Sequence, residues 1–321
     1  MLNRKILLVR PKQTLADDGN YRECRFFSSW KHKNKLVEFT LPACLQETTG
    51  QTTVPFGYGV LKTAETLIAS EICEELWTPD CPNVELALAG VEIFTNGSGS
   101  HHQLRKLDSR LALMKSATSK SGGVYLYSNH RGGDGGRLYF DGSSIICLNG
   151  EVLGQASQFS LVDVEVLCCT VDLSDVRSFR QGINSFQEHS SRSALTIEPL
   201  IVSPEDLVNY KLCYQGDLRR PLSRPISPRI HSPEEECGLG PACWMWDYLR
   251  RSGAAGFLLP LSGGADSASG KIHNTAVIMS FIPSCLQFLI LFVFLLMSRS
   301  YTYVKCAASV ESCVNWQLKR L

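Results

Sequence analysis

The alternation of hydrophobic and polar positions in the first hundred residues predicts short strands separated by turn-rich stretches. Apolar runs occur at 4–10 (RKILLVR), within 59–73 (GVLKTAETLIASEIC) and at 90–96 (GVEIFTN). Such short runs, rich in Val, Ile and aromatic residues, are typical of strands. Between the last two runs, 74–90 (EELWTPDCPNVELALAG) predicts a loop that leads into a short helix.

A longer helix is predicted over 102–122, where the apolar period changes from two to about 3.6 and Gly122–Gly123 ends the pattern. Its apolar positions are Leu104, Leu107, Leu111 and Met114. Farther along, Asn149–Gly150 separates two apolar runs, which is a strong hairpin signal. Strands that alternate with helices, together with hairpins, predict a layered α/β domain over residues 1–190.

The composition changes after this domain. Residues 191–231 are rich in Pro, Arg and Ser and are predicted to form a linker. A capping box in 232–236 (SPEEE) then predicts the start of a helix and of a second domain, 232–269. This domain contains a Trp-bearing helix at 241–252 and an apolar strand at 256–262.

Composition narrows the possible functions. The chain has 321 residues, 44% of them hydrophobic, so it can bury a core, and its net charge of +1 argues against a nucleic-acid partner. Charged residues interrupt the apolar stretch at the N-terminus, unlike a secretory signal. The 13 cysteines form no C-x-x-C pair and no zinc-type spacing. This pattern predicts free thiols, no metal-binding cysteine cluster and a reducing, cytoplasmic compartment.

One stretch sets a cysteine among carboxylates: residues 70–77 read SEICEELW. Negative charge disfavours the thiolate that cysteine chemistry requires, so a functional Cys73 needs a cation beside it. An ammonium group can stabilise both a thiolate and a tetrahedral oxyanion. Lys12, which directly follows Pro11 at the end of an apolar run, is the candidate. Taken alone, Cys73 would be a small buried hydrophobic residue.

Several motifs occur in an order that resembles a known superfamily. LLVRPKQTLADDGNYRECRFF (7–27), IASEICEELW (68–77) and GVEIFTNGSGSHH (90–102) resemble the nitrilase superfamily. With LLPLSGGADSA (258–268) downstream, the chain resembles the glutamine-dependent NAD synthetases over about residues 2–269. This resemblance implies an α-β-β-α sandwich with a Glu–Lys–Cys triad. That glutaminase domain would be fused to an ATP-dependent, Rossmann-like synthetase domain.

The resemblance also implies catalytic roles. Cys73 matches the nucleophile that attacks the side-chain amide of glutamine and releases ammonia as a thioester forms. Lys12 matches the lysine that supports the oxyanion. Glu23, in YRECR, matches a further carboxylate beside that lysine.

Other positions match substrate-binding residues of the family. Tyr21 and Ser100 resemble glutamine-binding positions, and Lys106 falls where a basic residue would meet the substrate carboxylate. Glu74 and Glu75, which follow the cysteine, are expected to be structural or to orient the substrate, and neither is expected to be the general base.

The chain departs from the family pattern at its start. In the family the general-base glutamate lies well upstream of the lysine, whereas here the lysine is already residue 12. We therefore expect a chain truncated at both ends, whose sandwich lacks its first strands. Loss of a general base typically costs a factor of about 10²–10⁴ in rate. The expectation is an inactive or partial fragment.

A second motif, 260–267, predicts a phosphate-binding loop between a strand and a helix. Paired glycines let several N–H groups point into one concavity, and a helix N-terminus favours anions. The Walker A pattern fails because Ala265 replaces its first glycine and Ile272 replaces its Ser/Thr. The loop resembles the SGG-x-D-S pyrophosphate loop of ATP pyrophosphatases. Its residues are Pro260, Leu261, Ser262, Gly263, Gly264, Ala265, Asp266 and Ser267.

That resemblance implies ATP and Mg²⁺, with Asp266 either ordering the loop or helping to position the metal. It ends near residue 269, and 270–321 matches nothing in the family. Because Gly270–Lys271–Ile272 can be encoded by a sequence resembling a splice donor, we expect this hydrophobic tail to be translated intron. The alternative is a membrane anchor, since 276–297 carries no charge and has about the ~20 residues that span a bilayer.

The sequence therefore predicts a glutamine-dependent NAD synthetase, which uses ammonia from glutamine for ATP-dependent amidation of deamido-NAD. Its family assembles into homo-oligomers. Two other functions stay open: a stand-alone carbon–nitrogen hydrolase acting on a small amide or nitrile, and a non-catalytic interaction module with the nitrilase fold.

Overall fold

The computed structural model describes residues 1–33, 35–197, 200–212, 221–254, 256–257 and 262–270. The chain divides into two units, Met1–Gly240 and Pro241–Leu321. Pro260, Leu261 and the apolar segment 276–297 lie outside the described residues. Within the described part of the chain, no helix has the length and apolarity that a membrane span requires.

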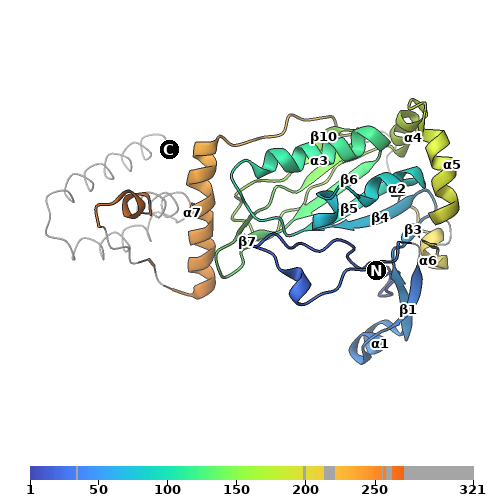
Figure 1. Ribbon diagram of the computed structural model, residues 1–321, viewed down its shortest axis with the longest axis horizontal. Helices are drawn as coiled ribbons and strands as arrows, with labels where there is room; N and C mark the ends of the chain where they lie inside the picture. The colour runs from blue at the N-terminus through green and yellow to red at the C-terminus, as the bar shows by residue number, and fades with distance from the viewer. Residues whose placement is uncertain (34, 198–199, 213–220, 255, 258–261, 271–321) are drawn as a thin grey trace. The chain divides into compact units, whose positions relative to one another are not determined.

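The first unit is built around a seven-stranded mixed sheet with the order β10-β9-β6-β5-β4-β3-β11 (Figure 1). Strands β4, β5 and β6 at its centre are parallel, as is the pair β11–β3, and the other neighbours are antiparallel. The strands are β3 (Val60–Lys62), β4 (Leu67–Ile72), β5 (Val91–Ser98), β6 (Val124–Asn129), β9 (Ile145–Leu148), β10 (Glu151–Gln155) and β11 (Ile201–Val202).

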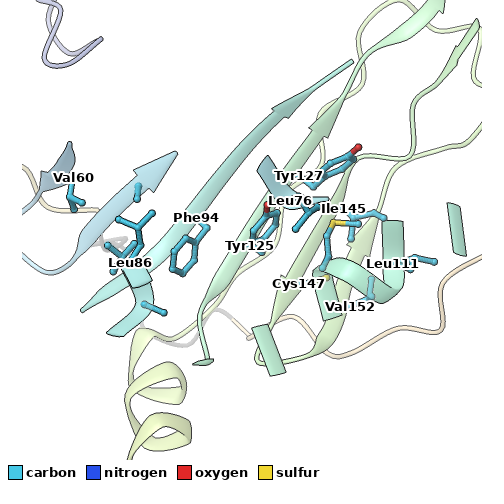
Figure 2. Packing of buried hydrophobic residues seen from close by; sticks show 14 of the residues in the cluster. Val60, Leu76, Leu86, Phe94, Leu111, Tyr125, Tyr127, Ile145, Cys147 and Val152 are labelled. Atoms are coloured by element: carbon cyan, nitrogen blue, oxygen red, sulfur yellow. The ribbon is translucent and has the colours of Figure 1, made fainter. Parts of the chain in front are cut away.

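Helices α2 (Pro82–Leu88) and α3 (Lys106–Ser121) cover one face of this sheet (Figure 1). Side chains from both helices meet those of the central strands in the main core, as Figure 2 shows for Leu86, Phe94, Leu111 and Tyr125. Because side chains alternate along a strand, the neighbours of these core residues point to the opposite face. The α/β class expected from the pattern is confirmed, and the structure adds that the sheet is mixed.

The opposite face of the sheet packs against α4 (Leu173–Gln181). Val176 of this helix is fully buried with Val124, Ile146 and Leu153. Helix α5 (Phe186–Ile197) follows and contacts α2. The first unit therefore buries apolar side chains on both faces of the sheet.

The predicted hairpin and long helix form, with one correction. Asn149 and Gly150 both have positive φ at the β9–β10 turn, and a Cβ on Gly150 would lie 2.8 Å from Ser119 Cβ, so glycine is required there. Helix α3 buries Leu107, Leu111 and Met114 but begins only at Lys106, two residues after Leu104. Leu104 is 52% exposed, so its place in the helical stripe was wrong. A residue before the first turn does not share the helical period.

The predicted strand at 4–10 is also wrong. The segment makes only two isolated bridges: Lys5 pairs with Leu2, and Val9 pairs with Phe56 of β2 (Thr53–Gly57). Strand β2 itself pairs with β1 (Leu36–Thr40) in a separate two-stranded sheet. At Ile6, upstream of Val9, the side chain of Gln51 takes the place of a neighbouring strand. Its Oε1 accepts from Ile6 N at 2.7 Å and its Nε2 donates to Ile6 O at 3.0 Å. A side-chain amide thus satisfies the backbone that a neighbouring strand would otherwise pair.

The remaining elements of this unit are short. They are η1 (Glu23–Arg25), α1 (Ala43–Thr49), η2 (Cys73–Leu76), β7 (Arg131–Gly133), β8 (Tyr139–Asp141) and α6 (Glu205–Val208). Strands β7 and β8 form a further antiparallel pair.

The predicted linker 191–231 contains the end of α5, β11 and α6, and its later residues, around Ile226 and Arg229, lie along the edge of β10. Ile226 N donates to Val152 O at 2.8 Å, and Gln155 exchanges two hydrogen bonds with the backbone of Arg229, at 2.8 and 3.0 Å. This contact covers a strand edge that would otherwise be open to pairing. Helix α7 (Pro233–Ser252) then begins with the expected capping box, in which Ser232 and Glu235 exchange hydrogen bonds at 2.9 and 3.2 Å.

Candidate active site

Cys73 occupies a strained position directly after the carboxyl end of β4. It is the first residue of η2 and has φ of +45°. Its backbone N–H donates to Asn96 Oδ1 on the neighbouring strand β5 at 2.9 Å. A non-glycine residue in this region costs about 1–3 kcal/mol and persists where the surrounding structure holds it, often at a functional site. The turn presents a half-buried thiol at the end of two parallel strands.

Glu75 connects the Cys73 turn to the segment that carries Lys12. Its carboxylate, fully buried, accepts from Arg10 at 3.0 and 3.2 Å, from Gln13 N at 2.6 Å and from Ile72 N at 2.9 Å. Lys12 lies between Arg10 and Gln13 in the sequence. A single carboxylate therefore holds the lysine segment against the turn that begins at Cys73.

The Lys12 ammonium group is paired with Glu23 at 2.7 and 2.9 Å. Glu23 is fixed in turn, because its Oε2 also accepts from Ala16 N at 2.7 Å. Burial raises the pKa of Glu74, and the positive charges of Lys12 and Lys106 oppose that rise. Lys12 is thus close enough to influence the residue directly after Cys73. The structure brings Lys12, Glu23 and the Cys73 turn into one neighbourhood.

Tyr21 is held near the thiol by the loop after β5. Its hydroxyl donates to Gly99 O at 2.5 Å and accepts from His101 N at 3.1 Å. Burial, followed by the negative charge of a Cys73 thiolate among other causes, raises the pKa of Tyr21 to about 12. Tyr21 therefore stays a neutral phenol at ordinary pH.

His101 is held in a neutral tautomer by its partners. Because the Tyr21 hydroxyl proton goes to Gly99, we assign the proton of His101 to Nδ1, which lies 2.9 Å from Tyr21 Oη. Arg137 donates to Asn20 Oδ1 at 2.9 Å, so the Asn20 amide nitrogen faces His101 Nε2 at 3.3 Å. Burial and the Lys106 charge lower the pKa of His101. Its role is to hold Tyr21.

This arrangement predicts a pH dependence of stability. The folded pKa of His101 lies below its usual 6.5, so the unfolded chain binds a proton first as the pH falls. The contribution of neutral His101 to the free energy of unfolding is fully present above about pH 6.5. It is lost progressively as the pH falls toward the lower pKa of the folded state. Below pH 6.5 the free energy of unfolding, measured in urea, should fall less steeply with falling pH in His101→Gln than in the wild type. An equal pH dependence in the two proteins would contradict a neutral His101 in the folded state.

Two buried hydroxyl groups lie near Cys73: Ser100 Oγ and Tyr127 Oη, which are close enough to each other for a hydrogen bond that lowers the pKa of Tyr127. Burial raises the pKa of Tyr127, and a thiolate at Cys73 adds to that rise, which places the two side chains in electrostatic reach of each other. Buried polar groups are normally paired with protein, water or ligand. These two hydroxyls can therefore serve a polar substrate.

Lys106, the first residue of α3, shares the neighbourhood of Cys73. It is half-buried, and its Nζ lies 5.6 Å from the centroid of the Trp77 ring. Burial and then the charge of Arg110 lower the pKa of Lys106, whereas Asp18 and Cys73 act in the opposite direction. A partly desolvated cation at this position is suited to binding a carboxylate.

The sequence interpretation missed four residues that shape the site. Asn129 Oδ1 accepts from Ser100 N at 2.9 Å, and Arg110 donates to Asp141 at 2.7 Å in a fully buried ion pair. Asn96 and Asn129 lie at the carboxyl ends of adjacent parallel strands, where polar side chains converge, so their positions offered a signal. Arg110 offered none, because a charged residue in a helical stripe is ordinarily solvent-exposed.

The described part of the predicted phosphate loop is an exposed turn that opens a helical stretch at 265–270. Gly263 has φ of +85°. Ser262 Oγ lies 3.2 Å from Ser267 Oγ, Gly264 N donates to Ser262 Oγ at 3.4 Å, and Ser267 donates to Gly264 O at 3.0 Å. An exposed glycine turn before a helical stretch is compatible with phosphate. Among the described residues, no group of three or more His, Cys, Asp or Glu side chains could hold a metal ion.

Comparison with known proteins identifies the family of this chain. The family model described as carbon-nitrogen hydrolase matches residues 1–181. Glutamine-dependent NAD(+) synthetases from Bos taurus and Arabidopsis thaliana are each 54% identical over 268 residues, or 84% of this chain. The chain spans only 37% and 36% of those relatives, little more than a third of their length.

Two solved structures share the fold at lower identity. A glutamine-dependent NAD(+) synthetase from Cytophaga hutchinsonii aligns with a TM-score of 0.57 at 22% identity, over 84% of this chain and 33% of that one. A glutamine-dependent NAD+ synthetase from Acinetobacter baumannii, solved in complex with ADP, aligns with a TM-score of 0.53 at 19% identity, over 83% and 37%. At these identities the likeness establishes the fold alone.

Proposed function

Because the chain belongs to the carbon–nitrogen hydrolase family and is homologous to glutamine-dependent NAD synthetases, we propose that its first unit binds glutamine and releases ammonia from the side-chain amide. One observation carries this proposal: Glu75 fastens the Lys12 segment to the strained turn that presents Cys73. A nucleophile and an ammonium group in one neighbourhood are the elements that amide cleavage by a thiol requires.

In the proposed reaction, Cys73 Sγ attacks the amide carbon, the carbon–nitrogen bond breaks, ammonia leaves and a thioester forms. Water then hydrolyses the thioester to glutamate and regenerates the thiol. The Cys73 N–H is committed to Asn96 Oδ1, so the oxyanion needs another donor. An ammonium group has three N–H donors, and two of those of Lys12 are directed at Glu23, which leaves one for the oxyanion.

The remaining predicted residues would bind the substrate. The buried hydroxyl of Ser100, beside that of Tyr127, would receive polar groups of glutamine. Lys106 would meet the substrate carboxylate, and Tyr21, held by His101, would form a wall of the site. Glu23 would orient the Lys12 ammonium group, and we assign no general-base role to it.

The complete proposed activity is ATP-dependent amidation of deamido-NAD with this ammonia. Bound ATP would supply the activation of the substrate carboxylate. Ser262, Gly263 and Gly264 would contribute to its phosphate site, together with Pro260, Leu261, Ala265, Asp266 and Ser267. Support comes from the exposed turn at Gly263 and from the homology, while Mg²⁺, homo-oligomer assembly and a cytoplasmic location stay predictions.

Covalent labelling tests the glutamine site without requiring turnover. A chloromethyl ketone analogue of glutamine should alkylate half-buried Cys73 faster than the exposed cysteines Cys24, Cys44 and Cys168, as read by peptide mass spectrometry. L-glutamine should protect Cys73, and L-asparagine should not. The Cys73→Ala variant identifies the labelled peptide and should release no ammonia from glutamine.

Three other outcomes would contradict this function. Protection by small amides such as acetamide but not by glutamine would favour a stand-alone hydrolase. Labelling of Cys73 no faster than of Cys24, with no protection, would favour the non-catalytic module. Ammonia release that persists unchanged in Cys73→Ala would exclude Cys73 as the nucleophile.

A further inference from the structure

A chain of buried polar groups runs beneath Cys73 across the three parallel strands. Asn96 on β5 accepts from Cys73 N at 2.9 Å and donates through Nδ2 to Tyr125 Oη at 3.0 Å. Tyr125 on β6 donates to Glu71 Oε2 on β4 at 2.5 Å. Side chains of Glu71, Tyr125 and Asn96 are all at most 1% exposed. None of them has a role in the chemistry described above.

Glu71 is surrounded by donors although it is buried. Cys81 Sγ lies 3.5 Å from its Oε1, and the Tyr125 hydroxyl faces its Oε2. Burial raises the pKa of Glu71, and the hydrogen bonds from Tyr125 and Cys81 oppose that rise. A buried carboxylate is costly unless hydrogen bonds compensate it, so Glu71 depends on these donors.

Glu71, at the end of this row of hydrogen-bonded groups, determines which of them donate and which accept. A Tyr hydroxyl has one proton, and while Glu71 accepts it, the Tyr125 oxygen is free to accept from Asn96 Nδ2. The Asn96 amide must then turn its Oδ1 toward the Cys73 N–H, where Ser98 Oγ also donates to it at 2.9 Å. A flipped Asn96 amide would set its N–H₂ group against the Cys73 N–H.

We propose that Glu71 is a positioning residue that, through Tyr125 and Asn96, holds Cys73 in its strained conformation for attack on the substrate. The inference rests on the proposed function of Cys73 as the nucleophile. Glu71 contacts neither the substrate nor the Cys73 sulfur in this role. It acts on the orientation of one amide, and that amide acts on one backbone N–H.

The proposal makes a specific expectation for removal of the carboxylate. In Glu71→Leu the Tyr125 proton loses its acceptor and turns to Asn96 Oδ1, which favours the flipped amide and releases the Cys73 turn. Glutamine-analogue labelling of Cys73 should then fall at least about tenfold in its maximal rate, the effect of one misdirected buried hydrogen bond. Its concentration dependence should change less than about twofold, because Tyr21, Ser100 and Lys106 keep their contacts.

A second substitution should restore what the first removes. In the double variant Glu71→Leu/Tyr125→Phe no hydroxyl competes for Asn96 Oδ1, and Ser98 still holds the amide. The labelling rate of the double variant should recover to that of Tyr125→Phe alone, a loss of about threefold or less. A purely structural role predicts instead that the double variant is the worst of the three.

Tyr58→Phe is the matched control, because it removes an equally buried hydroxyl from the same core, and that hydroxyl has no hydrogen-bond partner among the described residues. It should leave the rate unchanged. Iodoacetamide, which needs no glutamine site, should rank the variants in the same order at Cys73. If glutamine failed to protect Cys73, the proposed function would be rejected. The iodoacetamide ranking would still test the positioning role of Glu71. Equal rates in wild type and Glu71→Leu, or no recovery in the double variant, would overturn the positioning role.

Discussion

Glu75→Gln is expected to destabilise the first unit by about 3–5 kcal/mol, the range for breaking a buried ion pair by removing one partner. Arg10 is 8% exposed and Glu75 is fully buried, so the guanidinium would stay behind without its counter-charge. The glutamine amide would also direct an N–H₂ group at donors that now face a carboxylate, among them Gln13 N and Ile72 N.

The same substitution should suppress glutamine-analogue labelling of Cys73, because it frees the Lys12 segment from the Cys73 turn. Urea unfolding followed by circular dichroism measures the first effect, and peptide mass spectrometry the second. Glu188→Gln is the control: it makes the same chemical change in an exposed pair with Arg192, where side chains are 65% and 73% exposed. A change below about 0.5 kcal/mol is expected there. Similar small changes in both variants would contradict the structural role of Glu75.

The second large effect concerns the buried pair of Arg110 and Asp141. Asp141→Asn should cost about 3–5 kcal/mol, because Arg110 is completely buried and would lose its charged partner. Arg110 also reaches Ser100 O at 3.4 Å, so the loop that carries Ser100 should loosen. We expect higher concentrations of the glutamine analogue to be needed for half-maximal labelling.

A double variant and a pH series test the cause of this effect. Arg110→Met/Asp141→Leu should be less destabilised than the sum of its single variants, since no buried charge is left unpaired. Burial opposes ionisation of Asp141, but His102, with Nδ1 3.7 Å away, and Arg110 lower its pKa to about 2. This stability is present above the unfolded pKa of about 4 and is lost as the pH falls toward 2. Additive losses and no difference in acid stability between wild type and Asp141→Asn would contradict this account.

Short-range sequence patterns were sufficient to predict the elements that are stabilised by contacts between residues close in the sequence. The β9–β10 turn forms at Asn149–Gly150 because its backbone needs two positive φ angles, and the capping box at Ser232 depends on residues three positions apart. Helix α3 follows the spacing of Leu107, Leu111 and Met114. The 4–10 segment failed as a strand because the backbone of Ile6 pairs with the side chain of Gln51, a contact that no local pattern signals.

The three carboxylates around Cys73 show the limit of sequence reasoning most clearly. Glu71, Glu74 and Glu75 are neighbours in one short stretch, yet they lie in different surroundings. Glu75 accepts from Arg10, Glu71 accepts from Tyr125, and Glu74 stays partly exposed near two lysines. Strand alternation and the turn after β4 send these side chains in different directions, and only their partners decide their roles.

By itself the amino-acid sequence determined strands β4 and β5, helix α3, the hairpin, the capping box and the stretch in which a thiol follows a strand. Only the tertiary structure decided that Glu75 joins the Lys12 segment to the Cys73 turn. It also decided that the Asn96 amide donates to Tyr125, which lies two strands away from its acceptor Glu71. Local elements depend on contacts within a few residues. The role of a buried charged group depends on partners that only the folded chain brings within hydrogen-bonding distance.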